Sequence, residues 1–199
     1  MGRVARWALL SAAAAPVLLI GGWTLAAARQ PAGFDPLTAT ISALAAYDAT
    51  DRWVMTSAFA GLGVCHVTTA LGLRPAALPG RAVLAAGGVA TVLVAVFPLP
   101  AVGESTLHTV AAATAFGALA VWPALAWRRG SGVAGWGLRP VVSMVAATVL
   151  LALVGWFAIE LGSGERVGLA ERAAAGAQAL WPLAVTITAY RSGARETGG

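Results

Sequence analysis

Charged side chains are scarce in this sequence of 199 residues. They make up 11% of the chain, whereas a typical soluble domain carries about 25%. A chain with so few charges cannot cover a water-facing surface, which excludes an ordinary soluble globular protein. Lysine is absent, so all 13 basic residues are arginine. Cys65 is the one cysteine, and a single cysteine excludes a disulfide within the chain.

Nucleic-acid binding has to be weighed, because the net charge is +5 and the pI is about 11.0. The arginines, however, stand singly or in pairs at the ends of apolar runs. A basic stripe interleaved with aromatic residues is absent, so we expect no nucleic-acid partner. The sequence also lacks a phosphate loop, a nucleotide-binding fingerprint and a metalloprotease motif. We therefore expect no cofactor and no resident metal ion.

Long apolar runs are what the sequence has instead. Hydrophobic residues make up 59% of the chain, and the mean hydropathy is +0.79. A helix needs about twenty apolar residues to cross a bilayer. The segments that meet this requirement are residues 7–28, 53–73, 82–99, 106–127, 141–161 and 173–190. The first is longer than the core of a signal peptide, which spans about 7–15 residues. We predict an all-α bundle of six transmembrane helices that forms one domain over residues 1–199.

The arginines also predict the orientation of this bundle. Four of them fall on one side of the predicted membrane, and nine fall on the other: Arg3, Arg6, Arg74, Arg81, Arg128, Arg129, Arg139, Arg191 and Arg195. Cytoplasmic loops carry the excess of positive charge. We therefore predict that both termini are cytoplasmic and that the protein is a multi-pass component of the cell inner (plasma) membrane. All acidic residues except Glu196 lie outside or at the outer ends of helices.

The longest outer loop contains the stretch FDPLTATISALAAYDATDRW, residues 34–53. Asp35 followed by Pro36 is a helix-start signal, because Asp caps free amide groups and Pro suits the first helical position. Apolar residues then recur at offsets of four and three, at Leu37, Ile41 and Leu44. We predict a short amphipathic helix here that covers the outer mouth of the bundle as a lid.

The end of this loop leads into the second span. We expect Asp48 or Thr50 to cap that helix and Asp51 to lie in its first turn. The alternative for all three aspartates of the loop, Asp35 included, is that they are only caps and partners of helix dipoles.

Two further outer segments carry side chains suited to chemistry. Ser105 is expected to cap the fourth span, which places His108 at its third helical position, where an imidazole exchanges protons near neutral pH. The helix dipole favours Glu171 at the start of the sixth span but disfavours Arg172. Arg172 should therefore have a partner, either a carboxylate of the first outer loop or Glu160. The alternatives are that His108 only hydrogen-bonds its loop and that Arg172 reaches water or lipid headgroups.

These polar groups share one level of the membrane although they are distant in sequence. We predict that an outward-open polar pocket is lined by Asp35, Ser42, His108, Glu171 and Arg172. His66 lies roughly 20 Å deeper than the outer end of its span, so the two histidines cannot share a metal ion. His66 is either an interhelical hydrogen-bonding residue or a functional group inside the membrane.

Several of the predicted spans contain glycine residues. We expect close approaches between helices at Gly61, Gly63, Gly87, Gly88 and Gly117. Such residues suit packing within one chain and self-association equally well, so they indicate neither an oligomeric state nor a protein partner.

Four motifs, in order, carry a resemblance to a known family. They are FDPLTATISALAA, RWVMTSAFAGLGVCH, VFP followed by LHTVAAATAF, and GLAERAAAGAQALWPL. With these motifs, nearly the whole chain resembles the bacterial and archaeal six-helix membrane family called domain of unknown function 998. Many members of that family carry an acid where this chain has Ala43. The resemblance implies the six-helix fold and points to the same five pocket residues, and it brings no activity with it.

Two classes of function fit these observations. In the first, the protein binds a lipid or small amphiphile in a sensing or accessory role, with Arg172 on an anionic head group and His108 and Ser42 as hydrogen-bonding residues. In the second, it is an enzyme that acts by general acid–base chemistry on a lipid or isoprenoid-like substrate at the outer face. His108 would be the base or acid, Glu171 or Asp35 its partner, and Arg172 the electrostatic stabiliser. Proton-coupled transport through His66 is a weaker third idea, because broken helix pairs are absent. Membrane lipids are the expected partners in each case.

Overall fold

The computed structural model describes residues 3–129 and 135–195. Within these residues the chain forms α-helices and two short 3₁₀ helices, so the predicted all-α class is confirmed. The α-helices are α1 (Arg6–Ala27), α2 (Trp53–Gly72), α3 (Leu78–Val96), α4 (Thr106–Ala126), α5 (Pro140–Ser163) and α6 (Val167–Arg195). The 3₁₀ helices are η1 (Ser42–Ala45) and η2 (Trp136–Leu138).

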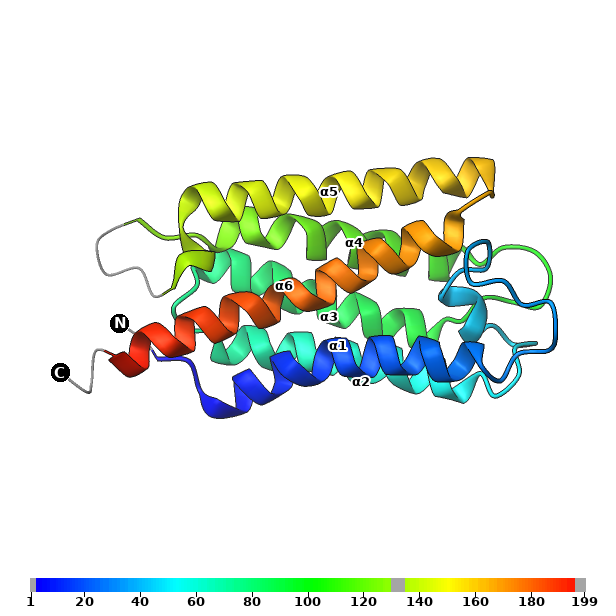
Figure 1. Ribbon diagram of the computed structural model, residues 1–199, viewed down its shortest axis with the longest axis horizontal. Helices are drawn as coiled ribbons and strands as arrows, with labels where there is room; N and C mark the ends of the chain where they lie inside the picture. The colour runs from blue at the N-terminus through cyan, green and yellow to red at the C-terminus, as the bar shows by residue number, and fades with distance from the viewer. Residues whose placement is uncertain (1–2, 130–134, 196–199) are drawn as a thin grey trace.

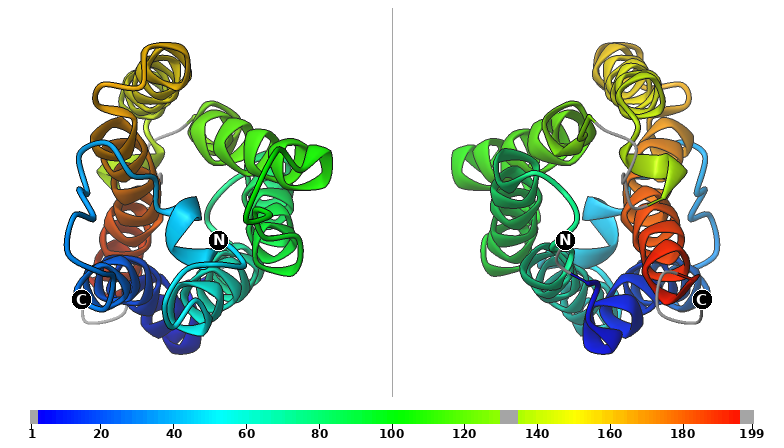
Figure 2. Two further views of the ribbon diagram at one scale, coloured as in Figure 1. Left: turned by 90° about the vertical axis from the view of Figure 1, so that its right-hand side faces the viewer. Right: turned by 90° about the vertical axis from the view of Figure 1, so that its left-hand side faces the viewer.

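The six α-helices run side by side and enclose an interior (Figures 1 and 2). Each helix packs against the next one in the chain, and α6 packs against α1, which closes the ring. This order follows the general rule that elements consecutive in the chain are usually neighbours in space. The 3₁₀ helix η1 lies inside one end of the ring, where it contacts α1 and α2 (Figure 2).

Five helices, α1 to α5, are long and apolar enough to cross a membrane. The protein is therefore a multi-pass membrane protein. Helix α6 has 29 residues but is not among the five, and it carries Glu171, Arg172 and Gln178 within its first half. Helix α3 begins four residues earlier than expected, because Pro79 suits its first turn. It ends at Val96, since Phe97 precedes a proline and has non-helical angles (φ −114°, ψ 72°).

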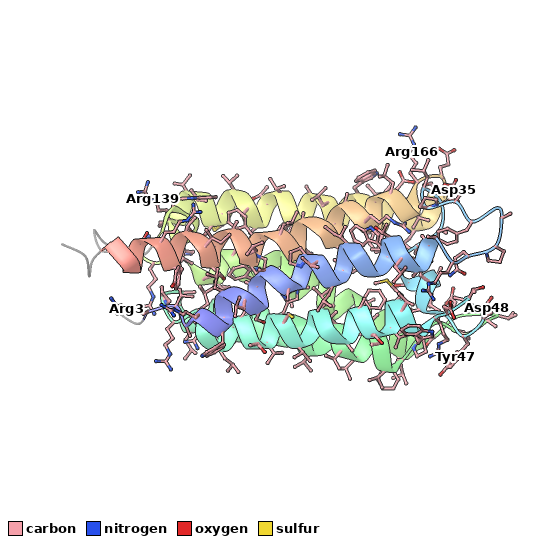
Figure 3. The ribbon with its side chains drawn as sticks, turned by 60° about the horizontal axis from the view of Figure 1, so that its bottom comes forward. Arg3, Asp35, Tyr47, Asp48, Arg139 and Arg166 are labelled. Carbon is pink, nitrogen blue, oxygen red and sulfur yellow. The ribbon has the colours of Figure 1, made fainter. Side chains whose placement is uncertain are left out.

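The two ends of the bundle differ in their labelled charges (Figure 3). Arg3 and Arg139 lie at one end, and Asp35, Asp48 and Arg166 lie at the other. The end with Asp35 and Asp48 also holds η1 and is called the η1 end below. The chain enters α1 and leaves α6 at the opposite end (Figure 1).

Glycines bring α2 and α3 close together, as the sequence predicts. A Cβ atom added to Gly63 would collide with the carbonyl oxygen of Gly88, and one added to Gly88 would collide with that of Gly63. Gly117 of α4 behaves differently from the prediction. A Cβ atom there would meet nothing within 4 Å, because this part of α4 faces a cavity rather than a neighbouring helix.

The first loop folds without the amphipathic helix expected from Asp35. Asp35 instead stabilises a turn, in which its Oδ1 accepts a hydrogen bond from Leu37 N at 2.9 Å. The only helix among the described residues of this loop is η1, which has four residues. Leu37 is 51% exposed while Ile41 and Leu44 are buried, so the three do not share a face. The loop is held by tertiary contacts rather than by helical hydrogen bonds.

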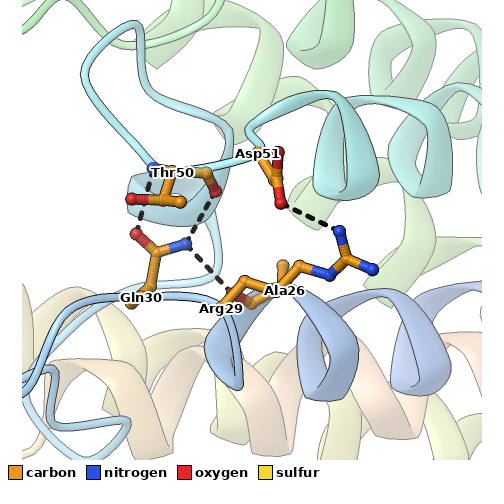
Figure 4. A network of polar contacts seen from close by, with 5 residues as sticks. All are labelled: Ala26, Arg29, Gln30, Thr50 and Asp51. Atoms are coloured by element: carbon orange, nitrogen blue, oxygen red, sulfur yellow. Dashed lines mark hydrogen bonds and ion pairs between the residues drawn. The ribbon is translucent and has the colours of Figure 1, made fainter.

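The start of α2 also differs from expectation. The cap residue is Arg52, which makes no side-chain cap bond, so neither Asp48 nor Thr50 caps the helix. Asp51 lies before the helix with a positive φ of 49°. Its carboxylate pairs with Arg29 Nη1 at 2.8 Å, beside hydrogen bonds between Gln30 and Thr50 (Figure 4). This contact joins the end of α1 to the start of α2.

Candidate functional site

The first loop is fastened to the start of α6. Leu169 N donates to the carbonyl oxygen of Leu37 at 3.0 Å. Arg172 Nη1 donates to the carbonyl oxygens of Pro36 at 2.7 Å and Ala39 at 2.8 Å. It also donates to Gly168 O, one turn earlier in α6, at 3.0 Å. The partner of Arg172 is therefore a set of backbone carbonyl groups, not the carboxylate that its sequence position suggested.

Gly168 lets this loop approach the helix. A Cβ atom at this position would collide with the carbonyl oxygens of Ala39 and Pro36. The motif GLAER therefore combines a glycine that admits the loop backbone with an arginine that hydrogen-bonds its carbonyl groups.

Glu171 holds the same loop from the inner side of α6. Its Oε2 accepts a hydrogen bond from Ile41 N, and its Oε1 accepts one from Ser42 Oγ at 3.1 Å. Glu171 is only 3% exposed. A buried carboxylate is tolerated when donors replace water, and here η1 and the residue before it supply those donors.

His108 is placed by the loop before α4, as predicted. Ser105 caps the helix by accepting from His108 N at 3.2 Å, which puts His108 at the third helical position. Its ring Nδ1 lies 2.9 Å from the carbonyl oxygen of Phe97. A carbonyl oxygen only accepts, so Nδ1 carries the proton. In the neutral ring, Nε2 is then a hydrogen-bond acceptor.

A large cavity of about 360 Å³ lies beside these groups at the η1 end of the bundle. Its polar residues are Thr40, Ser42, His108, Thr109 and Glu171, and its apolar residues include Leu99, Ala112, Phe116, Val154, Phe157 and Leu161. The cavity therefore has polar groups from the loop and the helix starts, and an apolar wall from α4 and α5.

Helix α5 explains why this space exists. Its buried residues are Ser143, Ala146, Ala147 and Leu150, all in its first half. From residue 151 to its end no residue of α5 is buried. The second half thus stands away from the core, and it touches α4 through Phe157, whose ring centroid lies 5.2 Å from that of Phe116. Several cavity-lining residues are exposed, among them Ala113, Ala158 and Leu161, so the cavity opens sideways between α4 and α5.

A small cavity of about 40 Å³ lies deeper, inside the ring. It is lined by His66, Thr91 and Gln178, and also by Ser42 and Glu171, which line the large cavity as well. His66 is 1% exposed, and both of its ring nitrogens are without a hydrogen-bond partner among the described residues. His66 is therefore a buried polar group that faces a cavity, and none of the helices that the structure describes hydrogen-bonds it.

The five predicted site residues have three different placements. Ser42, His108 and Glu171 line the large cavity together. Arg172 holds the loop, and Asp35 is exposed in the turn of that loop. The apolar wall went unrecognised in the sequence, although one signal was present: His108, Ala112 and Phe116 are spaced by four residues and so share one face of α4. Within residues 3–129 and 135–195, no group of three or more metal-ligating side chains is close enough to hold a metal ion.

Comparison with known proteins identifies a family for this chain but no individual related protein. The family model described as "Protein of unknown function (DUF998)" matches residues 12–188. This match includes all four motifs on which the resemblance rests. No curated protein and no solved structure matches the chain.

Proposed function

Because the chain belongs to the DUF998 family of proteins of unknown function, we propose a role on the basis of its own structure. The protein is a plasma-membrane protein that binds a lipid or small amphiphile in the large cavity, in a sensing or accessory role. Helix α6 is the sixth span, both termini are cytoplasmic, and the η1 end faces outward. The arginine distribution supports this orientation.

The large cavity is the observation that carries the proposal. Its volume of about 360 Å³ falls at the lower end of the range for small-molecule sites, about 300–1,000 Å³. Polar groups gather at the η1 end, and apolar side chains of α4 and α5 line the remainder. An amphiphile matches both the polar and the apolar lining of the cavity, with its head group beside Glu171 and His108 and its chain along Phe116 and Phe157.

The loop of residues 34–46 takes the role of a fixed cover. Glu171, Arg172 and Leu169 all bond to its backbone or to Ser42. A cover that is fastened in this way directs ligand entry to the sideways opening between α4 and α5. A membrane amphiphile reaches that opening without leaving the bilayer.

Native mass spectrometry of the gently solubilised protein tests this binding. Gly117 and Gly155 form a matched pair, because a Cβ atom at either position meets nothing within 4 Å. Gly117 lines the large cavity, whereas Gly155 is exposed on α5 and does not line it. We expect the wild type and Gly155→Leu to retain a bound amphiphile and Gly117→Leu to lose it. Identical bound-lipid profiles in all three proteins would remove the proposal.

The orientation has its own test. After Cys65→Ser, single cysteines are introduced at two exposed positions at opposite ends of the bundle, as Asp48→Cys and Arg74→Cys. A membrane-impermeant thiol reagent added to intact cells should label the first variant and spare the second. The reverse pattern would invert the proposed topology.

The enzyme hypothesis has one specific observation in its favour. His108 presents an acceptor nitrogen in the same cavity as the carboxyl group of Glu171, and a general base must lie about 2.6–3.2 Å from the proton that it removes. If the protein is an enzyme, His108→Ala should accumulate an unconverted lipid whose mass differs from that of the wild-type ligand. The same bound mass in both proteins favours a binding role.

A further inference from the structure

We propose that the ligand of the large cavity has a hydrogen-bond-donating head group without negative charge, namely a hydroxyl or an ammonium on a single apolar chain. This inference rests on the proposed function and names the chemical class of its ligand. It differs from the expectation drawn from sequence, in which Arg172 binds an anionic head group.

The first support is the charge of the cavity wall. Glu171 carries the one carboxyl group, and no arginine is present, among the described residues that line the large cavity. Each of its carboxylate oxygens accepts one hydrogen bond from the loop. A carboxylate oxygen has two lone pairs, so Glu171 retains capacity to accept further hydrogen bonds from a ligand.

The second support is the direction of the other hydrogen bonds. The Nδ1–H of His108 is engaged by Phe97 O, which leaves Nε2 as an acceptor. The hydroxyl proton of Ser42 is donated to Glu171, which leaves the Ser42 oxygen as an acceptor. The Thr40 hydroxyl oxygen accepts a hydrogen bond from Ala43 N at 3.0 Å, so its O–H can still donate, whereas the Thr109 hydroxyl adapts to either role. The polar wall is therefore rich in acceptors.

The third support is the position of Arg172. Its Nη1 is occupied by three carbonyl oxygens, and Arg172 does not line the large cavity. The other terminal nitrogen of its guanidinium group, Nη2, is buried, so it cannot contact a ligand in the large cavity. An anionic head group would meet the Glu171 carboxylate in a cavity that no arginine lines, which is unfavourable in an apolar surrounding.

The shape of the cavity accounts for the single chain. The opening lies between α4 and the second half of α5, and the contact between Phe116 and Phe157 bounds the gap between these helices. One chain fits along the apolar wall of a space of about 360 Å³, while its remaining length extends sideways into the bilayer.

The test compares three probes that differ only in their head groups. They are an alkyl amine, an alkyl alcohol and an alkyl sulfonate of equal chain length, each with a nitroxide on the chain. The protein is held in nanodiscs of phosphatidylcholine at neutral pH, so that the host lipid carries no net charge. Electron paramagnetic resonance then measures the immobilised fraction of each probe.

We expect the affinities for the amine and the alcohol, obtained from the immobilised fractions, to be at least about tenfold higher than that for the sulfonate. One charge-assisted hydrogen bond supplies a ratio of this size. Gly117→Leu should abolish this immobilisation, and Gly155→Leu should preserve it. A sulfonate that binds as well as the amine, still in a Gly117-dependent manner, overturns the head-group inference while the proposed function stands. Immobilisation that Gly117→Leu leaves unchanged removes the proposed function itself.

Two variants test the individual acceptors. Glu171→Gln should lower the affinity for the amine to that for the alcohol, because the charge is lost. Since Glu171 also holds the loop, His108→Leu provides a second route that leaves the loop contacts in place. This substitution should lower the affinities for the amine and the alcohol alike and leave the affinity for the sulfonate unchanged. The inference is contradicted if the three probes bind with equal affinity to the wild type and also bind with equal affinity to His108→Leu.

Discussion

Glu171 Oε1 accepts a hydrogen bond from Ser42 Oγ at 3.1 Å, across a separation of 129 residues. Both residues line the large cavity and the small cavity. The pair therefore stands between the sideways opening of the bundle and its interior, and it ties the first loop to the last helix.

Glu171→Ala should destabilise the protein by about 2–6 kcal/mol. The substitution leaves the buried Ile41 N–H and the Ser42 hydroxyl without their acceptor, and each unsatisfied buried group costs about 1–3 kcal/mol. Thermal unfolding in detergent measures the difference. Glu104→Ala is the control, because Glu104 is an exposed loop residue and should change stability by no more than about 0.5 kcal/mol. Equal effects of the two substitutions would contradict the role assigned to Glu171.

Gly168→Ala should loosen the first loop without unfolding the bundle. The added methyl group would collide with the carbonyl oxygens of Ala39 and Pro36, so the loop must move away from α6. Hydrogen exchange of residues 34–46 should become faster, while that of α2 and α3 stays unchanged. Gly162→Ala is a matched control at the same end of the bundle, since a Cβ atom there meets nothing within 4 Å. Unchanged exchange in the loop of Gly168→Ala would show that the loop does not depend on this close contact.

Two substitutions of Asp51 separate the contribution of its ion pair to stability from that of its backbone conformation. Its pair with Arg29 is about 40% exposed on both sides, and exposed pairs contribute at most about 1 kcal/mol. Asp51→Asn removes the charge but keeps a residue that tolerates the positive φ of 49°. We expect a loss of less than about 1 kcal/mol for Asp51→Asn and a larger loss for Asp51→Val, because β-branched residues disfavour that conformation. Chemical unfolding compares the two, and a smaller loss for Asp51→Val would refute the argument from backbone conformation.

His66 should be hydrogen-bonded to water. The small cavity beside it measures about 40 Å³, which is room for about two to three water molecules, and its polar lining supplies the partners that such water needs. Water-edited solid-state NMR of ¹⁵N-histidine protein tests this, with His108→Ala used to assign the two rings. A strong transfer from water to the His66 nitrogens is expected. A dry His66 signal would mean that the unpaired ring nitrogens are simply tolerated in the core.

Local sequence rules predicted the parts of this protein that depend on neighbouring residues. The apolar runs predicted all six helices, because a run of about twenty apolar residues has few other stable arrangements. The cap at Ser105 and the helical position of His108 were also predicted, since a helix cap is made between residues three positions apart. The predicted close approach at Gly63 and Gly88 is confirmed as well.

The first loop shows where such rules fail. The spacing of Leu37, Ile41 and Leu44 matched a helix, yet the carbonyl groups of Pro36 and Ala39 bond to Arg172 and that of Leu37 bonds to Leu169. Backbone groups engaged by a distant helix are not available for a helix of their own. Local periodicity cannot reveal that competition, because the competing partner lies more than a hundred residues away.

The sequence by itself determined the class of this protein, its six helices and the collection of polar side chains at one end. Only the tertiary structure decided what those side chains do. It assigned Arg172 to the loop, left Gly117 facing empty space, and gathered Ser42, His108 and Glu171 around one cavity. The physical reason is that hydrophobicity and helix caps are properties of short segments, whereas a cavity depends on how far α5 stands from α4, which no single segment specifies.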